Sequence, residues 1–100
     1  MKINVNTDKH IHGDMQRHVE DAVHAALGRF AGQLSRVEVH LRDANGGKTG
    51  ANDKHCLMEA RIDGRPPLAA SDDADSVASA INGAARKLQR VLDSSLGKLA

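Results

Sequence analysis

The six histidines of this chain are the residues whose chemistry first suggests a functional site. His10 and His12 lie two residues apart, with no cysteine or acidic partner nearby at the spacing of a zinc site. Two more lie six residues apart in a helical pattern, so they point in different directions. His40 and His55 could face each other across two strands, but two ligands do not make a metal site. We therefore predict no metal site.

The single cysteine, Cys56, is the strongest candidate for a nucleophile. It alternates with Met58 and Ile62, whereas His55 beside it points to the opposite face of the same strand. Cys56 is therefore expected in the core as a small apolar residue. No Ser-His-Asp set or pair of carboxylates stands out elsewhere. The sequence predicts no enzyme and no cofactor.

A short glycine-rich segment, Gly46-Gly47-Lys48-Thr49, resembles the end of a phosphate-binding P-loop. That motif requires a further glycine five residues before Gly47, where this chain has Arg42. The segment also leads into a strand, so no helix N-terminus follows to hold phosphate. We interpret it as part of a hairpin loop.

The charged residues give the remaining signal. There are 14 Lys and Arg against 13 Asp and Glu, and the formal net charge is +1. Because no long run of like charge occurs, a basic tail or a polybasic membrane anchor is excluded. Basic residues gather instead in the last helical segment, at Arg86, Lys87 and Arg90, with Arg17 in the first. Such residues also complement a helix C-terminus, and most charged helix faces are only solvated.

Periodicity divides the chain into six elements. Alternation of apolar and polar residues predicts strands at 2–6, 36–42, 55–62 and 68–71. Apolar residues at three- and four-residue spacing predict a helix of about five turns from Met15 to Phe30, with Asp14 as its N-cap and its end near Gly32. A second helix should begin at Ser71-Asp72-Asp73, whose side chains can cap it, and carry an apolar stripe from Val77 to Leu92.

The order β-α-β-β-β-α predicts an α+β fold with one four-stranded mixed sheet. A helix between the first two strands makes them parallel and adjacent, and the later strands follow as an antiparallel meander. Each helix has one apolar stripe, so both should pack on one face of the sheet. One hundred residues support one core, so we expect a single domain over residues 1–100. The sheet residues expected beneath the helices are Val37, Val39, Leu41, Met58 and Ile62.

The other sheet face is expected to be polar. It should display Lys2, Asn4, Arg36, Glu38, His40, Arg42, Leu57, Glu59 and Arg61. A base-binding sheet of the RNA-recognition type has stacking aromatics there, and none is present. RNA would therefore be held by phosphate contacts and shape.

Nothing in the sequence indicates export or a membrane. The first residues alternate between polar and apolar types and are followed by charged residues, whereas a signal peptide has an apolar core. No apolar run approaches the roughly 18 residues of a membrane span. We expect a cytoplasmic protein. The apolar residues are nearly all assigned to the two helix stripes and one sheet face, so no large apolar patch remains for a dimer interface. We therefore also expect a monomer when free.

The sequence resembles the family of ribosome hibernation-promoting factors and ribosome-associated inhibitor A. That family typically shows an Asp-rich helix start, an Ala-Ile segment and a basic stretch of the Lys-Leu-x-x-Gln type. The resemblance rests on Asp53 to Gly64, Leu68-Ala69-Ala70, Asp75 to Ile81 and Arg86-Lys87-Leu88-Gln89-Arg90. The family fold has the same element order and is similar to double-stranded-RNA-binding domains.

This resemblance implies a translation inhibitor that binds 16S-type rRNA of the small ribosomal subunit, in the channel of mRNA and tRNA, and keeps idle ribosomes inactive under stress. It also implies that Arg17, Arg86, Lys87 and Arg90 hold rRNA phosphates, and that the chain corresponds to the short form of the family. No DNA partner is expected. The alternative is a small protein-interaction domain with no RNA partner, whose charged helix faces are merely solvated.

Overall fold

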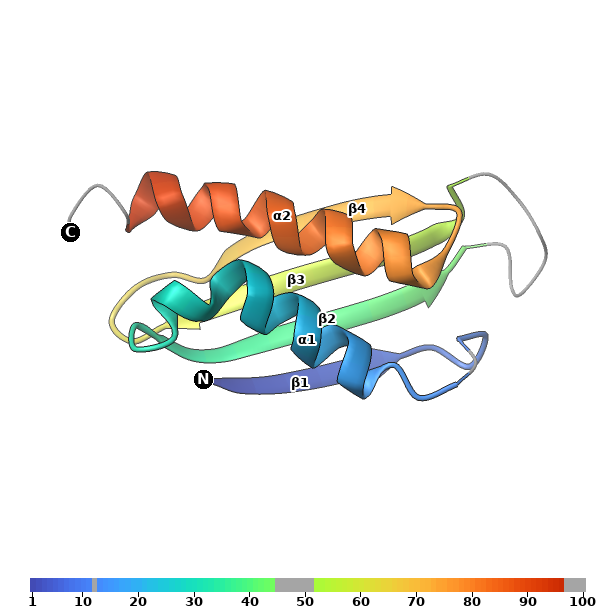
Figure 1. Ribbon diagram of the computed structural model, residues 1–100, viewed down its shortest axis with the longest axis horizontal. Coiled ribbons are helices and arrows are strands. Elements are labelled where there is room, and N and C mark those ends of the chain that lie inside the picture. Colours follow the sequence, from blue (N-terminus) through green and yellow to red (C-terminus); the bar gives the residue numbers. More distant parts are fainter. Residues whose placement is uncertain (12, 45–51, 97–100) are drawn as a thin grey trace.

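The computed structural model describes residues 1–11, 13–44 and 52–96 and shows two helices packed on one face of a four-stranded sheet (Figure 1). The sheet order is β1-β2-β3-β4. The elements are β1 (Lys2–Thr7), α1 (Gln16–Leu27), a 3-10 turn η1 (Gly28–Phe30), β2 (Leu34–Asp43), β3 (Lys54–Ile62), β4 (Leu68–Ala74) and α2 (Val77–Ser95).

The topology confirms the prediction of an α+β fold. β1 pairs with β2 in parallel, while β2–β3 and β3–β4 are antiparallel. The register places Val39 between Val5 of β1 and Met58 of β3. Successive side chains of a strand point to opposite faces, so this row is apolar toward the helices and the next row is polar. Both helices consequently bury their apolar stripes against the same face (Figure 1).

The core is built from small and aliphatic side chains. Val37, Val39 and Met58 are fully buried, and Leu41 is nearly so. Ile62 also lies on this face and packs against the core, but it is only half-buried because it is the last residue of β3. From the helices, Val23, Leu27, Ile81, Leu88 and Leu92 fill the space above the sheet.

The first helix is shorter than predicted. It ends at Leu27, and the chain continues as the 3-10 turn η1. Gly28 has a low helix propensity, and the three-residue spacing from Leu27 to Phe30 suits a 3-10 turn, which buries both side chains. At the other end, the prediction of Asp14 as N-cap was wrong by one residue, because the N-cap is Met15, which forms no side-chain cap hydrogen bond. The Asp14 carboxylate still accepts a hydrogen bond of 2.9 Å from the backbone N–H of Gln16, the first residue of α1.

The start of the second helix was predicted wrongly. Ser71, Asp72 and Asp73 belong to β4, which continues to Ala74 because β3 pairs with it as far as Lys54. Backbone ladder bonds along β3 prevail over the capping tendency of these side chains. The observed N-cap is Ser76, whose hydroxyl accepts a hydrogen bond of 3.1 Å from the N–H of Ser79.

Within the described residues, no helix is long and apolar enough to cross a membrane.

Candidate nucleic-acid interface

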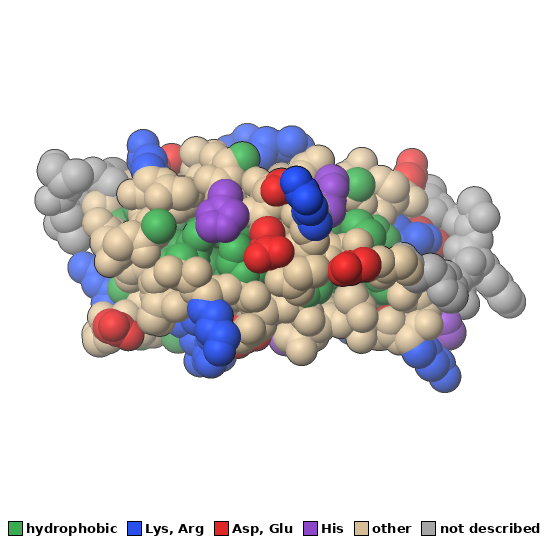
Figure 2. All heavy atoms as spheres, turned by 60° about the horizontal axis from the view of Figure 1, so that its bottom comes forward, with side chains coloured by type: hydrophobic (Ala, Val, Ile, Leu, Met, Phe, Trp, Pro, Cys, Tyr) green, Lys and Arg blue, Asp and Glu red, His purple; other side chains and the backbone are tan. Residues whose placement is uncertain are grey.

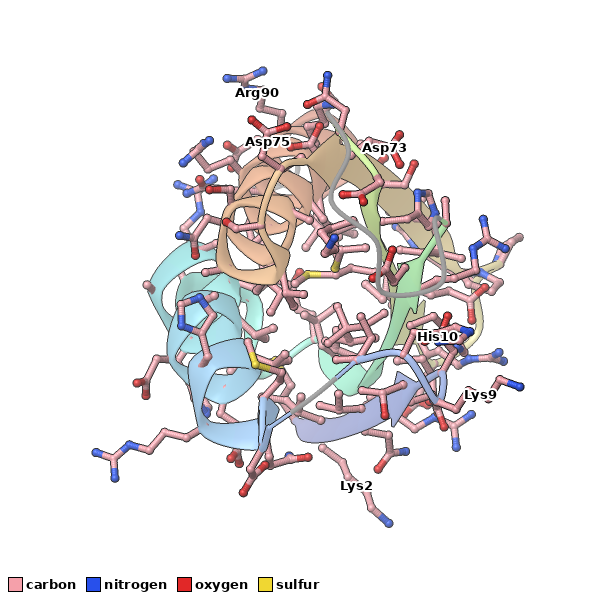
Figure 3. All side chains as sticks on the ribbon, turned by 90° about the vertical axis from the view of Figure 1, so that its right-hand side faces the viewer. Lys2, Lys9, His10, Asp73, Asp75 and Arg90 are labelled. Carbon is pink, nitrogen blue, oxygen red and sulfur yellow. The ribbon has the colours of Figure 1, made fainter. Side chains whose placement is uncertain are left out.

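The exposed face of α2 carries two arginines one turn apart. Arg86 and Arg90 are both exposed and lie opposite the buried Ile81 and Leu88. Figure 3 shows Arg90 projecting from α2 away from the sheet. Neither arginine forms an ion pair with a described residue. Two guanidinium groups are therefore available for an anionic partner.

Lys87 differs from its two neighbours because it already has a partner. Its Nζ lies 2.8 Å from Oδ1 of Asp72 on β4. This hydrogen bond holds the pKa of the Asp72 carboxyl below its ordinary value. The close approach of α2 to β4 depends on Gly83, since a Cβ at that position would collide with the Asp72 carboxylate. A phosphate must compete with Asp72 for Lys87.

Replacing this competitor gives a first prediction. Asp72→Asn should tighten binding to ribosomes by about 1.5- to 5-fold, because an exposed ion pair contributes about 0.2–1 kcal/mol. Equilibrium binding to purified ribosomes measures the change. Asp73→Asn is the matched control, since it removes the same charge from the same strand on the opposite face. An equal gain in both variants would mean that net charge alone matters and that Lys87 takes no part.

The remaining predicted site residue, Arg17, lies apart from the cations of α2. Its side chain is 92% exposed, and its Nε is 4.0 Å from Oδ2 of Asp21 one turn later. In helical register it is turned away from Ala22 and Ala26, which line a hollow together with residues of α2. The face formed by α1 and β1 mixes acidic, basic and imidazole side chains (Figure 2). Arg17 of α1 thus has an acidic neighbour one turn away, whereas Arg86 and Arg90 of α2 form no ion pair with a described residue.

A shallow groove of about 240 Å³ runs between the two helices. Its walls are the small side chains of Ala22, Ala25, Ala26 and Ala85, with Asn82, Arg86 and Gln89 along α2. Arg29 of η1 and Asp93 of α2 form an ion pair that joins the two helices. The groove therefore has small side chains along both helices and one cationic side chain, Arg86, in its wall.

A larger hollow, of about 400 Å³, lies on the outer face of the sheet. It is lined by Asn6, Thr7, Asp8, His40, Leu41, Arg42, His55 and Leu57. His55 pairs in register with Arg42, and His40 pairs with Leu57. The two histidines are thus offset by one row, and both line the same hollow. Alternation along the sequence predicted that both histidines lie on the same face of the sheet, but it did not predict the hollow between the strands.

The other chemical candidates do not gain support. Cys56 is fully buried, and desolvation raises the pKa of its thiol to about 12, so almost no thiolate forms at neutral pH. The part of the chain that the structure describes contains no group of three or more metal-binding side chains. His12 and the glycine-rich segment 46–49 lie outside the described residues.

Comparison with known proteins decides the family. The model of the family described as sigma 54 modulation protein / S30EA ribosomal protein matches residues 3–100. The chain belongs to the S30EA ribosomal protein family. Membership confirms the family resemblance found in the sequence and makes the chain a ribosome-associated, non-enzymatic protein. No curated protein matches it significantly.

Solved structures support the same fold for this S30EA family member. A ribosomal subunit interface protein from Coxiella burnetii has a TM-score of 0.71 at 13% identity, covering 97% of this chain and 99% of that one. The Protein Y N-terminal domain from Thermus thermophilus has a TM-score of 0.73 at 15% identity, covering 95% and 99% respectively. At such identities the likeness establishes the fold alone.

Proposed function

We propose that this S30EA family member binds 16S-type rRNA of the small ribosomal subunit in the mRNA and tRNA channel and keeps idle ribosomes inactive under stress. It would act in the cytoplasm, as a monomer when free. The observation that carries the proposal is the pair of exposed arginines, Arg86 and Arg90, which lie on one face of α2 in a ribosome-associated family and form no ion pair with a described residue. The solved relative named a subunit interface protein supports a position between the subunits.

The inhibition would be steric. A rigid domain seated in the channel excludes mRNA and tRNA without any chemical step, so its affinity for rRNA determines its effect. Arginine suits this role because its planar guanidinium donates two parallel hydrogen bonds to one phosphate. Arg86 and Arg90 would anchor α2, Lys87 would exchange Asp72 for a phosphate, and Arg17 would add a contact from α1.

Sedimentation of a cell lysate through a sucrose gradient tests the proposed partner. Probing the fractions for this chain should place it with 30S subunits and 70S ribosomes in stationary-phase cells. A signal confined to the top of the gradient would contradict the proposal and favour the alternative, a protein-interaction domain without an RNA partner.

Salt dependence tests the proposed contacts. With about four phosphate contacts at −0.7 to −0.9 each, log affinity against log salt concentration should have a slope of roughly −3 to −4. The measurement is binding to purified small subunits over a series of KCl concentrations at constant Mg²⁺. A slope near zero would show that phosphate contacts do not hold the complex.

A further inference from the structure

We propose that the hollow on the outer face of the sheet binds a nucleoside phosphate, with the phosphate on Arg42 and the base over Leu57 and His40. This site is separate from the helix face that the proposed function uses, because the strand residues Asn6, His40 and Leu57 that line the hollow lie on the face of the sheet opposite both helices. Its volume of about 400 Å³ falls within the range of small-molecule sites.

Strand register assembles the hollow at one end of the sheet. One row across the strands is Asn6, His40 and Leu57, and the next holds Arg42 and His55. At this end of the sheet the turn after β1 places Lys9 and His10 beside the tips of β1 and β2, on the side away from the helices (Figure 3). Basic and imidazole groups of β2 and β3 therefore line the cavity, and those of the turn after β1 lie near the same end of the sheet.

Arg42 supplies the phosphate contact. Its side chain is exposed and forms no hydrogen bond or ion pair with a described residue. His55 is fixed beside it, since its Nδ1 lies 2.7 Å from Oδ1 of Asp73. Because the Asp73 carboxylate can only accept, Nδ1 donates in this contact, and Nε2 of His55 donates to a phosphate only when the imidazole carries a hydrogen on both nitrogens. A guanidinium with a positioned imidazole is a typical arrangement for a phosphate.

The acidic residue of the hollow is engaged by the protein itself. The two carboxylate oxygens of Asp8 accept backbone N–H bonds from His10, at 2.9 Å, and from Asp43, at 3.1 Å. Desolvation acts to raise the pKa of the Asp8 carboxyl, but the backbone hydrogen bonds outweigh it and hold this pKa below its ordinary value. The Asp8 carboxylate therefore stays ionised, and both of its oxygens already accept hydrogen bonds from the backbone.

The base contact comes from side chains that are not Phe, Tyr or Trp. Leu57 is an apolar residue on an otherwise polar face and is half-buried there. Imidazole rings also stack on unpaired bases, and His40 lines the hollow beside Leu57. The amide of Asn6 can donate to and accept from the edge of a base. Apolar, planar and amide groups beside a cation match a nucleotide better than they match phosphate alone.

The test is an NMR titration of the ¹⁵N-labelled chain with AMP, adenosine and inorganic phosphate. AMP should bind saturably, with the largest shifts at His40, Arg42 and His55, and more tightly than either of its halves. Arg42→Gln should weaken AMP binding about tenfold, the cost of losing a charge-assisted contact. Arg61→Gln is the matched control, since Arg61 lies on the same sheet face but is paired with Glu59 at 2.9 Å. This control should bind AMP as the unchanged chain does.

A free nucleotide and an unstacked nucleotide of RNA have the same chemical groups. Comparing the affinity for AMP with the affinity for tetra-adenylate distinguishes these two ligands. Equal affinities for AMP and tetra-adenylate identify a free nucleotide, whereas tighter tetra-adenylate binding that Arg42→Gln abolishes identifies single-stranded RNA. The site is overturned if neither ligand binds saturably, if Arg42→Gln and Arg61→Gln weaken binding equally, or if inorganic phosphate binds as well as AMP. Arg86→Glu with Arg90→Glu should leave AMP binding unchanged, so this inference and the proposed function can fail separately.

Discussion

Replacing Arg86 and Arg90 together with glutamate is expected to abolish ribosome binding while the domain stays folded. The double change deletes two attractions to phosphate and adds two repulsions at the same positions. Both side chains are exposed, so the core should be unaffected. Neither lies in the last turn of α2, and the helix dipole acts only within that turn. Co-sedimentation with ribosomes measures binding, and a thermal melt of the same variant checks the fold.

The control for this variant is Arg36→Glu with Arg42→Glu on the outer face of the sheet. It makes the same change in net charge at exposed or half-buried positions. It should weaken ribosome binding less than the α2 variant, because these residues lie on the face away from the helices. If the control abolishes binding while the folded α2 variant binds normally, RNA is held by the sheet and the proposed helix site is wrong.

Val39→Asp is expected to destabilise the domain more than any surface change. Val39 is fully buried in β2 between Val5 and Met58, so the new carboxylate would have no partner there. An unpaired buried charge costs about 3–5 kcal/mol. In a domain of this size that loss lowers the melting temperature by more than about 12 °C. Thermal unfolding followed by circular dichroism measures the shift.

His40→Asp is the matched control for the buried charge. It places the same side chain one residue later in β2, on the exposed face. The loss should stay within the roughly 1 kcal/mol range of strand propensity. Equal melting temperatures for the two variants would show that Val39 does not lie in the core.

The sequence predicted the fold because alternation and helical spacing are properties of neighbouring residues. They assigned four strands and two helices, and placed Val37, Val39 and Met58 under the helices. They failed at Ser71 to Asp73, where a good capping sequence pairs with β3 instead. They also failed at Gly28, where the helix tightens to a 3-10 turn. Both errors lie at element ends, where long-range pairing and packing prevail over local preference.

For the candidate site, the sequence by itself determined which residues are cationic and which face of α2 carries Arg86 and Arg90. Only the tertiary structure decided which of these cationic side chains already pair with a carboxylate of the chain and which can bind an anionic partner. Lys87 meets Asp72 across 15 positions of the chain, and Arg29 meets Asp93 across 64. Such pairs, like the hollow beside Arg42, depend on how α2 and the strands pack. Periodicity along the chain carries no information on distances between segments that only folding brings together.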